Sequence, residues 1–145
     1  MIEFHWHELD TQFSPEQERV IHKWLVSLIH HYGHVLDSLS YVFCSDDYLL
    51  SLNQRHLQHD DLTDVISFPY ATTPNTIEGE IFISVDRVRE NAKEYQQSSQ
   101  RELLRVMAHG LLHFLGHKDK SYDEEEAMRQ AEDEALRKLP KALIL

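Results

Sequence analysis

One segment near the C-terminal end of the chain constrains the fold most strongly. Over residues 99–115, apolar side chains recur at helical spacing on more than one stripe, which predicts a helix buried on most of its sides. Within this helix, His109 and His113 are one turn apart, so both imidazoles lie on one face. Each imidazole on an otherwise apolar helix needs a polar partner, because its hydration is lost. A bound cation is a partner that both can share.

The residues that follow the histidine pair predict a metal site. Gly116 permits the left-handed turn that ends a helix, so the chain can return toward the imidazoles. Asp119 is then placed to supply a third, oxygen ligand, and His117 is the alternative third ligand if the helix continues. Three protein ligands leave a position for water, as in catalytic zinc sites. We therefore predict one Zn²⁺, or another divalent metal, held by His109, His113 and Asp119.

Gly110 separates this segment from the zinc-peptidase motif. Zinc peptidases carry a glutamate directly after the first histidine, as general base to the metal-bound water. A glycine cannot accept a proton, so peptide hydrolysis by that route is disfavoured. A zinc peptidase that uses another base stays open as an alternative. A metal at this position can also activate water toward a phosphoryl group.

The rest of the chain predicts an α+β fold. Apolar alternation and β-branched runs predict strands over 2–7, 39–44, 63–68 and 80–84, with a loop over 70–77. Capping residues and helical periodicity predict five helices. They run from Ser14-Pro15 to Tyr32-Gly33, from the Ser45-Asp46-Asp47 cap through Leu57, from Ser84 or Val85 to about Gln96, from a Ser98 or Ser99 cap through Leu115, and from the Ser121 cap to near Pro140. No linker or repeat interrupts these elements. We expect a single domain, 1–145, with one mixed, roughly four-stranded sheet, about five helices and a zincin-like metal helix.

Composition and charge narrow the class of protein further. Of 145 residues, 41% are hydrophobic and 27% charged, a globular balance, and no run approaches the roughly 18 apolar residues of a membrane span. The single cysteine, Cys44, suits a reducing compartment, and the N-terminal residues show no secretory signal. We expect a cytoplasmic protein with no membrane partner. At a net charge of −11, binding to nucleic acid requires positive charge from a metal or a local patch.

Two groups of charged residues each allow two interpretations. A basic strip beside the metal helix could form, but interleaved glutamates favour ordinary helix-face ion pairs; its members would be Arg87, Arg89, Lys93, Arg101 and Arg105. The acidic runs over 123–126 and 132–134 are most simply solvated surfaces, and a surface for a basic ribosomal or assembly protein is the alternative. The chain has no phosphate-binding glycine loop, so we expect no nucleotide cofactor.

Three blocks of sequence together resemble the YbeY family of rRNA maturation factors. They cover residues 63–69, 78–84 and 109–119, in the order and spacing of the family. The resemblance implies a metal-dependent, single-strand-specific endoribonuclease of 16S rRNA processing and small-subunit quality control, with rRNA and the small ribosomal subunit as partners. The family's ligand histidines, at the first, fifth and eleventh motif positions, fall on His109, His113 and Asp119. The change from nitrogen to oxygen at the third position weakens the preference for softer metals, so that zinc stays possible and manganese or magnesium becomes more acceptable.

Other departures from the family pattern concern RNA binding. Family members commonly carry an arginine six residues before Thr63, where this chain has Leu57, and Leu62 replaces the family proline. Arg55 and His59 are candidates to face phosphate instead, and solvated loop residues are the other interpretation. The missing arginine keeps a second hypothesis open, a non-catalytic ribosome assembly factor with a structural metal. Beyond the metal-bound water, no catalytic general base is assigned.

Overall fold

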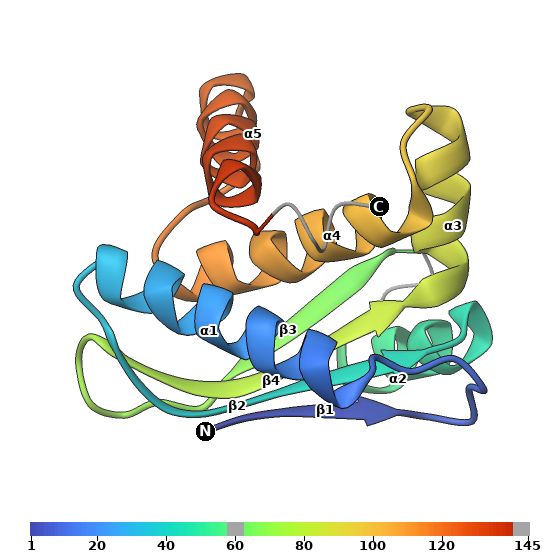
Figure 1. Ribbon diagram of the computed structural model, residues 1–145, viewed down its shortest axis with the longest axis horizontal. Helices are drawn as coiled ribbons and strands as arrows, with labels where there is room; N and C mark the ends of the chain where they lie inside the picture. Colours follow the sequence, from blue (N-terminus) through green and yellow to red (C-terminus); the bar gives the residue numbers. More distant parts are fainter. Residues whose placement is uncertain (58–62, 141–145) are drawn as a thin grey trace.

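The predicted α+β architecture is confirmed by the computed structural model, which describes residues 1–57 and 63–140 (Figure 1). Within these residues, four strands form one sheet in the order β1-β2-β4-β3. β1 (Ile2–Trp6), β2 (Val35–Cys44) and β4 (Thr76–Ser84) are parallel, and β3 (Val65–Pro69) runs antiparallel to β4 at one edge. The sheet is therefore mixed, as the sequence predicts.

Five helices are present in the described residues, and the sequence predicts where they begin. They are α1 (Pro15–His31), α2 (Asp46–Leu57), α3 (Val85–Glu94), α4 (Ser99–Phe114) and α5 (Tyr122–Arg137). A serine side chain accepts a backbone N–H at all five of these N-termini, namely Ser14, Ser45, Ser84, Ser98 and Ser121. Each cap satisfies a donor that the first helical turn would otherwise leave unpaired.

The predicted strand boundaries need correction. β2 begins four residues before residue 39, and β4 begins four residues before residue 80, inside the predicted loop over 70–77. These extensions pair with each other, Val35 with Thr76 and Leu36 with Ile77, so they exist only once both strands lie together. β3 is displaced the other way and begins at residue 65. Thr63 and Asp64, the first two residues of the predicted strand, therefore precede β3.

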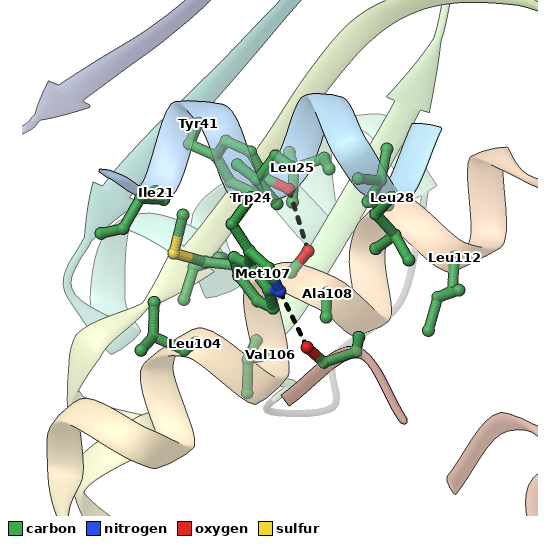
Figure 2. Packing of buried hydrophobic residues seen from close by; sticks show 14 of the residues in the cluster. Ile21, Trp24, Leu25, Leu28, Tyr41, Leu104, Val106, Met107, Ala108 and Leu112 are labelled. Carbon is green, nitrogen blue, oxygen red and sulfur yellow. Dashed lines mark hydrogen bonds between the residues drawn. The ribbon is translucent and has the colours of Figure 1, made fainter. Parts of the chain in front are cut away.

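The main core lies between one face of the sheet and helices α1 and α4 (Figures 1 and 2). Two buried hydrogen bonds fix how these layers meet. The Tyr41 hydroxyl on β2 donates to the Met107 carbonyl at 2.9 Å, and the Trp24 indole on α1 donates to the Ala135 carbonyl on α5 at 2.8 Å (Figure 2). The two bonds tie α4 to the sheet and α5 to α1. They thereby position both helices that carry the candidate site.

A smaller cluster covers the opposite face of the sheet. Leu49 and Leu52 of α2 pack there against Cys44 and Ile66. Helices on both faces explain why β4 has no exposed position and why β2 is exposed only within its first four residues. None of the helices in residues 1–57 and 63–140 combines the length and apolar character that a transmembrane helix requires.

Candidate metal centre

The end of α4 folds the chain back as the sequence predicts. Gly116 has a φ of +106°, and its N–H donates to the His113 carbonyl at 3.2 Å. The His117 N–H donates to the Leu112 carbonyl at 3.0 Å. This pair of bonds is the Schellman motif, which ends a helix through a left-handed residue. The reversal returns Asp119 to the histidine face of α4.

His109, His113 and Asp119 form the group that could hold a metal ion among the described residues. The His109 Nε2 atom lies 3.1 Å from His113 Nε2. Asp119 Oδ2 lies 3.2 Å from His109 Nε2 and 3.3 Å from His113 Nε2. The structure thus brings together the three residues that the sequence singles out, with one ligand atom of each at the corner of a nearly equilateral triangle.

The triangle matches the requirements of a small divalent cation. Zinc bonds of about 2.0–2.1 Å at tetrahedral angles separate neighbouring ligand atoms by roughly 3.3 Å. The three separations in the structure, 3.1, 3.2 and 3.3 Å, fall at or just below this value. Two nitrogens and one carboxylate oxygen form an accepted zinc donor set, and a tetrahedral ion would retain a fourth position. The residues present therefore fit a metal of this class.

The other predicted site residues lie elsewhere. His117 Nε2 is 3.1 Å from the Tyr32 hydroxyl, and the two rings meet edge to face. The His117 imidazole therefore contacts the C-terminal end of α1. Arg55 is exposed on α2, where its Nε donates to the Ser51 carbonyl at 3.4 Å. His59 lies outside the described residues.

Glu132 on α5 supports the first histidine. Its Oε2 atom is 2.6 Å from His109 Nδ1, and its Oε1 atom accepts from Arg105 at 2.9 Å. Arg105 also donates to Asp133 Oδ1 at 2.6 Å. A carboxylate that accepts the Nδ1 proton leaves Nε2 as the ring's ligand atom and fixes the plane of the imidazole. Glu132 thus orients His109 toward the other two donors.

The solvated interpretation of residues 132–134 is wrong for Glu132, which is only 6% exposed. The sequence contains a signal for this burial. Glu132 falls on the same face of α5 as Met128 and Ala135, the face that packs against the core. A carboxylate on an apolar helix face requires a partner, and here the partners are His109 and Arg105.

Burial and charge act in opposite directions on the ionisable groups of the centre. Burial lowers the pKa of His109, but the hydrogen bond and charge of Glu132 outweigh it, so the net pKa is raised. Asp64, just before β3, has a raised pKa because it is buried; the charge of His109 opposes this shift. The Asn91 amide donates to Asp64 Oδ2 at 3.3 Å. No local pattern in the sequence marks Asp64 as part of this centre.

Gly110 is explained by the approach of α4 to the sheet. A Cβ atom at this position would lie 2.9 Å from Ile81 Cγ2 and 3.3 Å from Val65 Cγ2. The position therefore faces the sheet and not the metal-ligand triangle. A glutamate here would point into the core, so the peptidase arrangement of residues is excluded at this position for a geometric reason.

The fold and the triangle define a class, an α+β protein with a potential metal site on a helix and its following turn. The family described as Endoribonuclease YbeY matches residues 3–140. The Endoribonuclease YbeY of Flavobacterium johnsoniae is 45% identical over 94% of this chain and 95% of its own length. That of Cytophaga hutchinsonii is 45% identical over 88% of this chain and 89% of its own. The chain belongs to the endoribonuclease YbeY family.

A solved structure agrees with this membership. The solution structure of TM1509 from Thermotoga maritima is 27% identical, covers 93% of this chain and 89% of its own, and has a TM-score of 0.62. Both the family resemblance and the fold class predicted from the sequence are thereby confirmed. Family membership also confirms the predicted type of protein, a nuclease of the hydrolase class.

Proposed function

We propose that this protein is a metal-dependent, single-strand-specific endoribonuclease that acts in 16S rRNA processing and small-subunit quality control. One Zn²⁺ would be held by His109, His113 and Asp119, within a single hydrolase domain over 1–145. The observation that carries the proposal is the triangle of ligand atoms 3.1–3.3 Å apart. The names of the relatives, Endoribonuclease YbeY, support RNA as the substrate.

The biological setting follows from the same proposal. The partners would be rRNA and the small ribosomal subunit, in the cytoplasm, with the acidic surfaces as a contact for a basic ribosomal or assembly protein. The phosphate contacts suggested for Arg55 and His59 stay predictions. At a net charge of −11, a bound divalent cation would supply positive charge where the phosphate must approach.

Each residue of the centre has a separate task in this proposal. When bound, the metal supplies an activated water and electrostatic stabilisation of the phosphoryl oxygens. His109 and His113 present their Nε2 atoms from a rigid helix, so little reorganisation is needed. Glu132 holds the Nδ1 proton of His109, and Arg105 holds Glu132. Gly116 sets the turn that places Asp119.

The test is cleavage of a labelled single-stranded 16S rRNA fragment by purified protein. We expect chelator-treated protein to be inactive, and added Zn²⁺, Mn²⁺ or Mg²⁺ to restore cleavage with an order of preference that identifies the metal. The His113→Ala variant should lose cleavage by at least about a hundredfold, and a duplex of the same sequence should resist. Equal cleavage with and without chelator, or by His113→Ala, would overturn the metal-dependent mechanism.

Two further results would favour the rival functions. Metal-loaded protein that binds the small subunit but does not cleave RNA would indicate an assembly factor with a structural metal. Cleavage of a denatured protein substrate, sensitive to chelator, would indicate a peptidase. The packing of Gly110 against Ile81 makes the second result the less expected one.

A further inference from the structure

A cavity of about 460 Å³ adjoins the metal centre and has no role in the chemistry described above. It lies between α3, α4 and α5, and both His109 and Asp64 line it. From there it extends to Arg101 on α4, Arg129 on α5 and Tyr95 at the end of α3. A molecule bound at the metal could therefore continue into this cavity.

The cavity follows one face of α4. Arg101, Arg105 and His109 are spaced four residues apart, so they lie one above another along the helix. Eight residues separate Arg101 from His109, about 12 Å along the helix axis at 1.5 Å per residue. This distance is large enough for the next part of a polymeric substrate, and too large for a second ligand of the same metal ion.

Two arginines in the cavity have hydrogen-bond donors that no described residue uses. Arg105 is committed to Glu132 and Asp133. By contrast, neither Arg101 nor Arg129 forms a side-chain ion pair or hydrogen bond with any residue that the structure describes. Elsewhere Arg89 and Lys93 each pair with a carboxylate three residues away on α3, as the helix-face interpretation predicts, whereas Arg87 pairs with Asp46 of α2.

The carboxylates of the cavity do not cancel these two charges at close range. Glu132 is already bonded to His109 and Arg105. Asp64 accepts from Asn91 and lies at the metal end. Glu102 is 5% exposed and forms no ion pair with Arg101 or Arg129 among the described residues. The end of the cavity away from the metal therefore presents two guanidinium groups without bonded partners in residues 1–57 and 63–140.

The chemistry of these side chains is that of a nucleotide site. A guanidinium group offers planar, paired N–H donors that match the oxygens of a phosphodiester. Tyr95 lines the same cavity and is 52% exposed, which makes its ring available to a base. Arginine contacts to the backbone, combined with aromatic stacking, are the usual means of binding single-stranded RNA without sequence preference.

We propose that this cavity seats a nucleotide of the RNA strand next to the phosphodiester at the metal centre. Arg101 and Arg129 bind its backbone phosphate, and Tyr95 stacks on its base. The inference rests on the proposed function, because the occupant is a continuation of that substrate. Binding an RNA strand to an acidic protein requires local positive charge, and Arg101 and Arg129 supply it in this proposal.

The test compares two double variants that each remove two positive charges. Arg101→Gln with Arg129→Gln alters the cavity, and Arg19→Gln with Arg137→Gln alters exposed positions outside it. Binding of a labelled single-stranded RNA is measured by fluorescence anisotropy in chelator, so that cleavage does not contribute. We expect the cavity pair to bind about tenfold or more weakly, with a log–log salt slope reduced by about 0.7–1.4. The control pair should stay within about twofold of the wild type.

Two further measurements separate this site from the metal centre. Tyr95→Leu should weaken RNA binding by about fivefold or more, and zinc affinity should be unchanged in all three variants. Equal RNA affinities of the cavity and control pairs would overturn the nucleotide site and leave the endoribonuclease proposal intact. Absence of RNA binding and cleavage by the metal-loaded wild type would overturn both. Reduced zinc affinity in the cavity pair would also contradict the assignment.

Discussion

The Oε2 atom of Glu132 lies 2.6 Å from the Nδ1 atom of His109, and this contact links α5 to α4, the helix that carries two of the three candidate metal ligands. Because one ring nitrogen is occupied, the other is directed at His113 and Asp119. Arg105 holds the second oxygen of the same carboxylate. The geometry of the candidate metal centre therefore depends on a residue 23 positions away along the chain.

Replacing this carboxylate should weaken metal binding without removing a ligand. In Glu132→Gln, the neutral amide makes His109 a less basic ligand and loses the ion pair with Arg105. We expect zinc affinity to fall by about 10- to 100-fold, as is usual for such supporting residues, measured by competition with a chromophoric chelator. The control is Glu134→Gln, an exposed position on the same helix. Unchanged affinity in Glu132→Gln would show that the contact does not support the metal.

The identity of the third ligand can be tested by metal content. Asp119→Ala should purify with little zinc, because two imidazoles alone hold the ion weakly. His117→Ala should retain it, because His117 contacts Tyr32 and not the triangle. Elemental analysis of both variants beside the wild type is the measurement. The reverse result, with zinc retained in Asp119→Ala and lost in His117→Ala, would make His117 the ligand.

Adding one methyl group at the helix–sheet contact should destabilise the protein. In Gly110→Ala, the new Cβ meets Ile81 Cγ2 at 2.9 Å, and Ile81 is fully buried. The overpacking cost of about 1–3 kcal/mol exceeds the gain in helix propensity of about 1 kcal/mol. We expect the free energy of unfolding in urea to fall by on the order of 1 kcal/mol. An unchanged or higher free energy of unfolding would mean that the sheet near Ile81 can shift to accommodate the added methyl group at little cost.

The buried carboxyl of Glu102 should make stability depend on pH. Burial raises its pKa in the folded protein above the ordinary value of 4.5, so the ionised form is less favourable in the folded state. The contribution of Glu102 to the free energy of unfolding is complete below pH 4.5 and declines as the pH rises through the pKa that Glu102 has in the folded protein. At pH 7, Glu102→Gln should therefore have a free energy of unfolding in urea higher than that of the wild type by on the order of 1 kcal/mol. At pH 4 the difference should be smaller.

The matched control for this pH dependence is Glu126→Gln, an exposed glutamate on α5. It should change the free energy of unfolding by less than about 0.5 kcal/mol at both pH values. A Glu102→Gln variant that is less stable than the wild type at pH 7 would contradict the raised pKa, because the charge would then be stabilising.

Cys44 should be chemically inert in the native protein. Burial, together with Asp86 and Asp46, raises the pKa of its thiol to about 12. At pH 8, only about one molecule in ten thousand then carries the reactive thiolate. Iodoacetamide should leave the folded chain unmodified and label it fully in denaturant, as followed by mass spectrometry. Rapid labelling of the folded chain would show that the thiol is accessible.

Local elements of the fold were predictable because their signals are local. Serine caps and proline at Pro15 mark helix starts within one turn of chain, and Gly116 marks a helix end by its backbone freedom. Strand lengths were less predictable. The extension of β2 from Val35 and of β4 from Thr76 arises only from pairing between the two strands, and the polar residues there carry little pattern of their own.

The same distinction holds within the candidate site. The sequence by itself determined which side chains are available as metal donors, because His109 and His113 are one helical turn apart and Asp119 follows a turn that glycine permits. Only the tertiary structure decided that Glu132 supports His109, that Asp64 lies beside it, and that Arg101 and Arg129 line one cavity. The physical reason is that ligand spacing within a helix follows from backbone geometry, whereas contacts between α4, α5 and β3 depend on how their apolar faces pack.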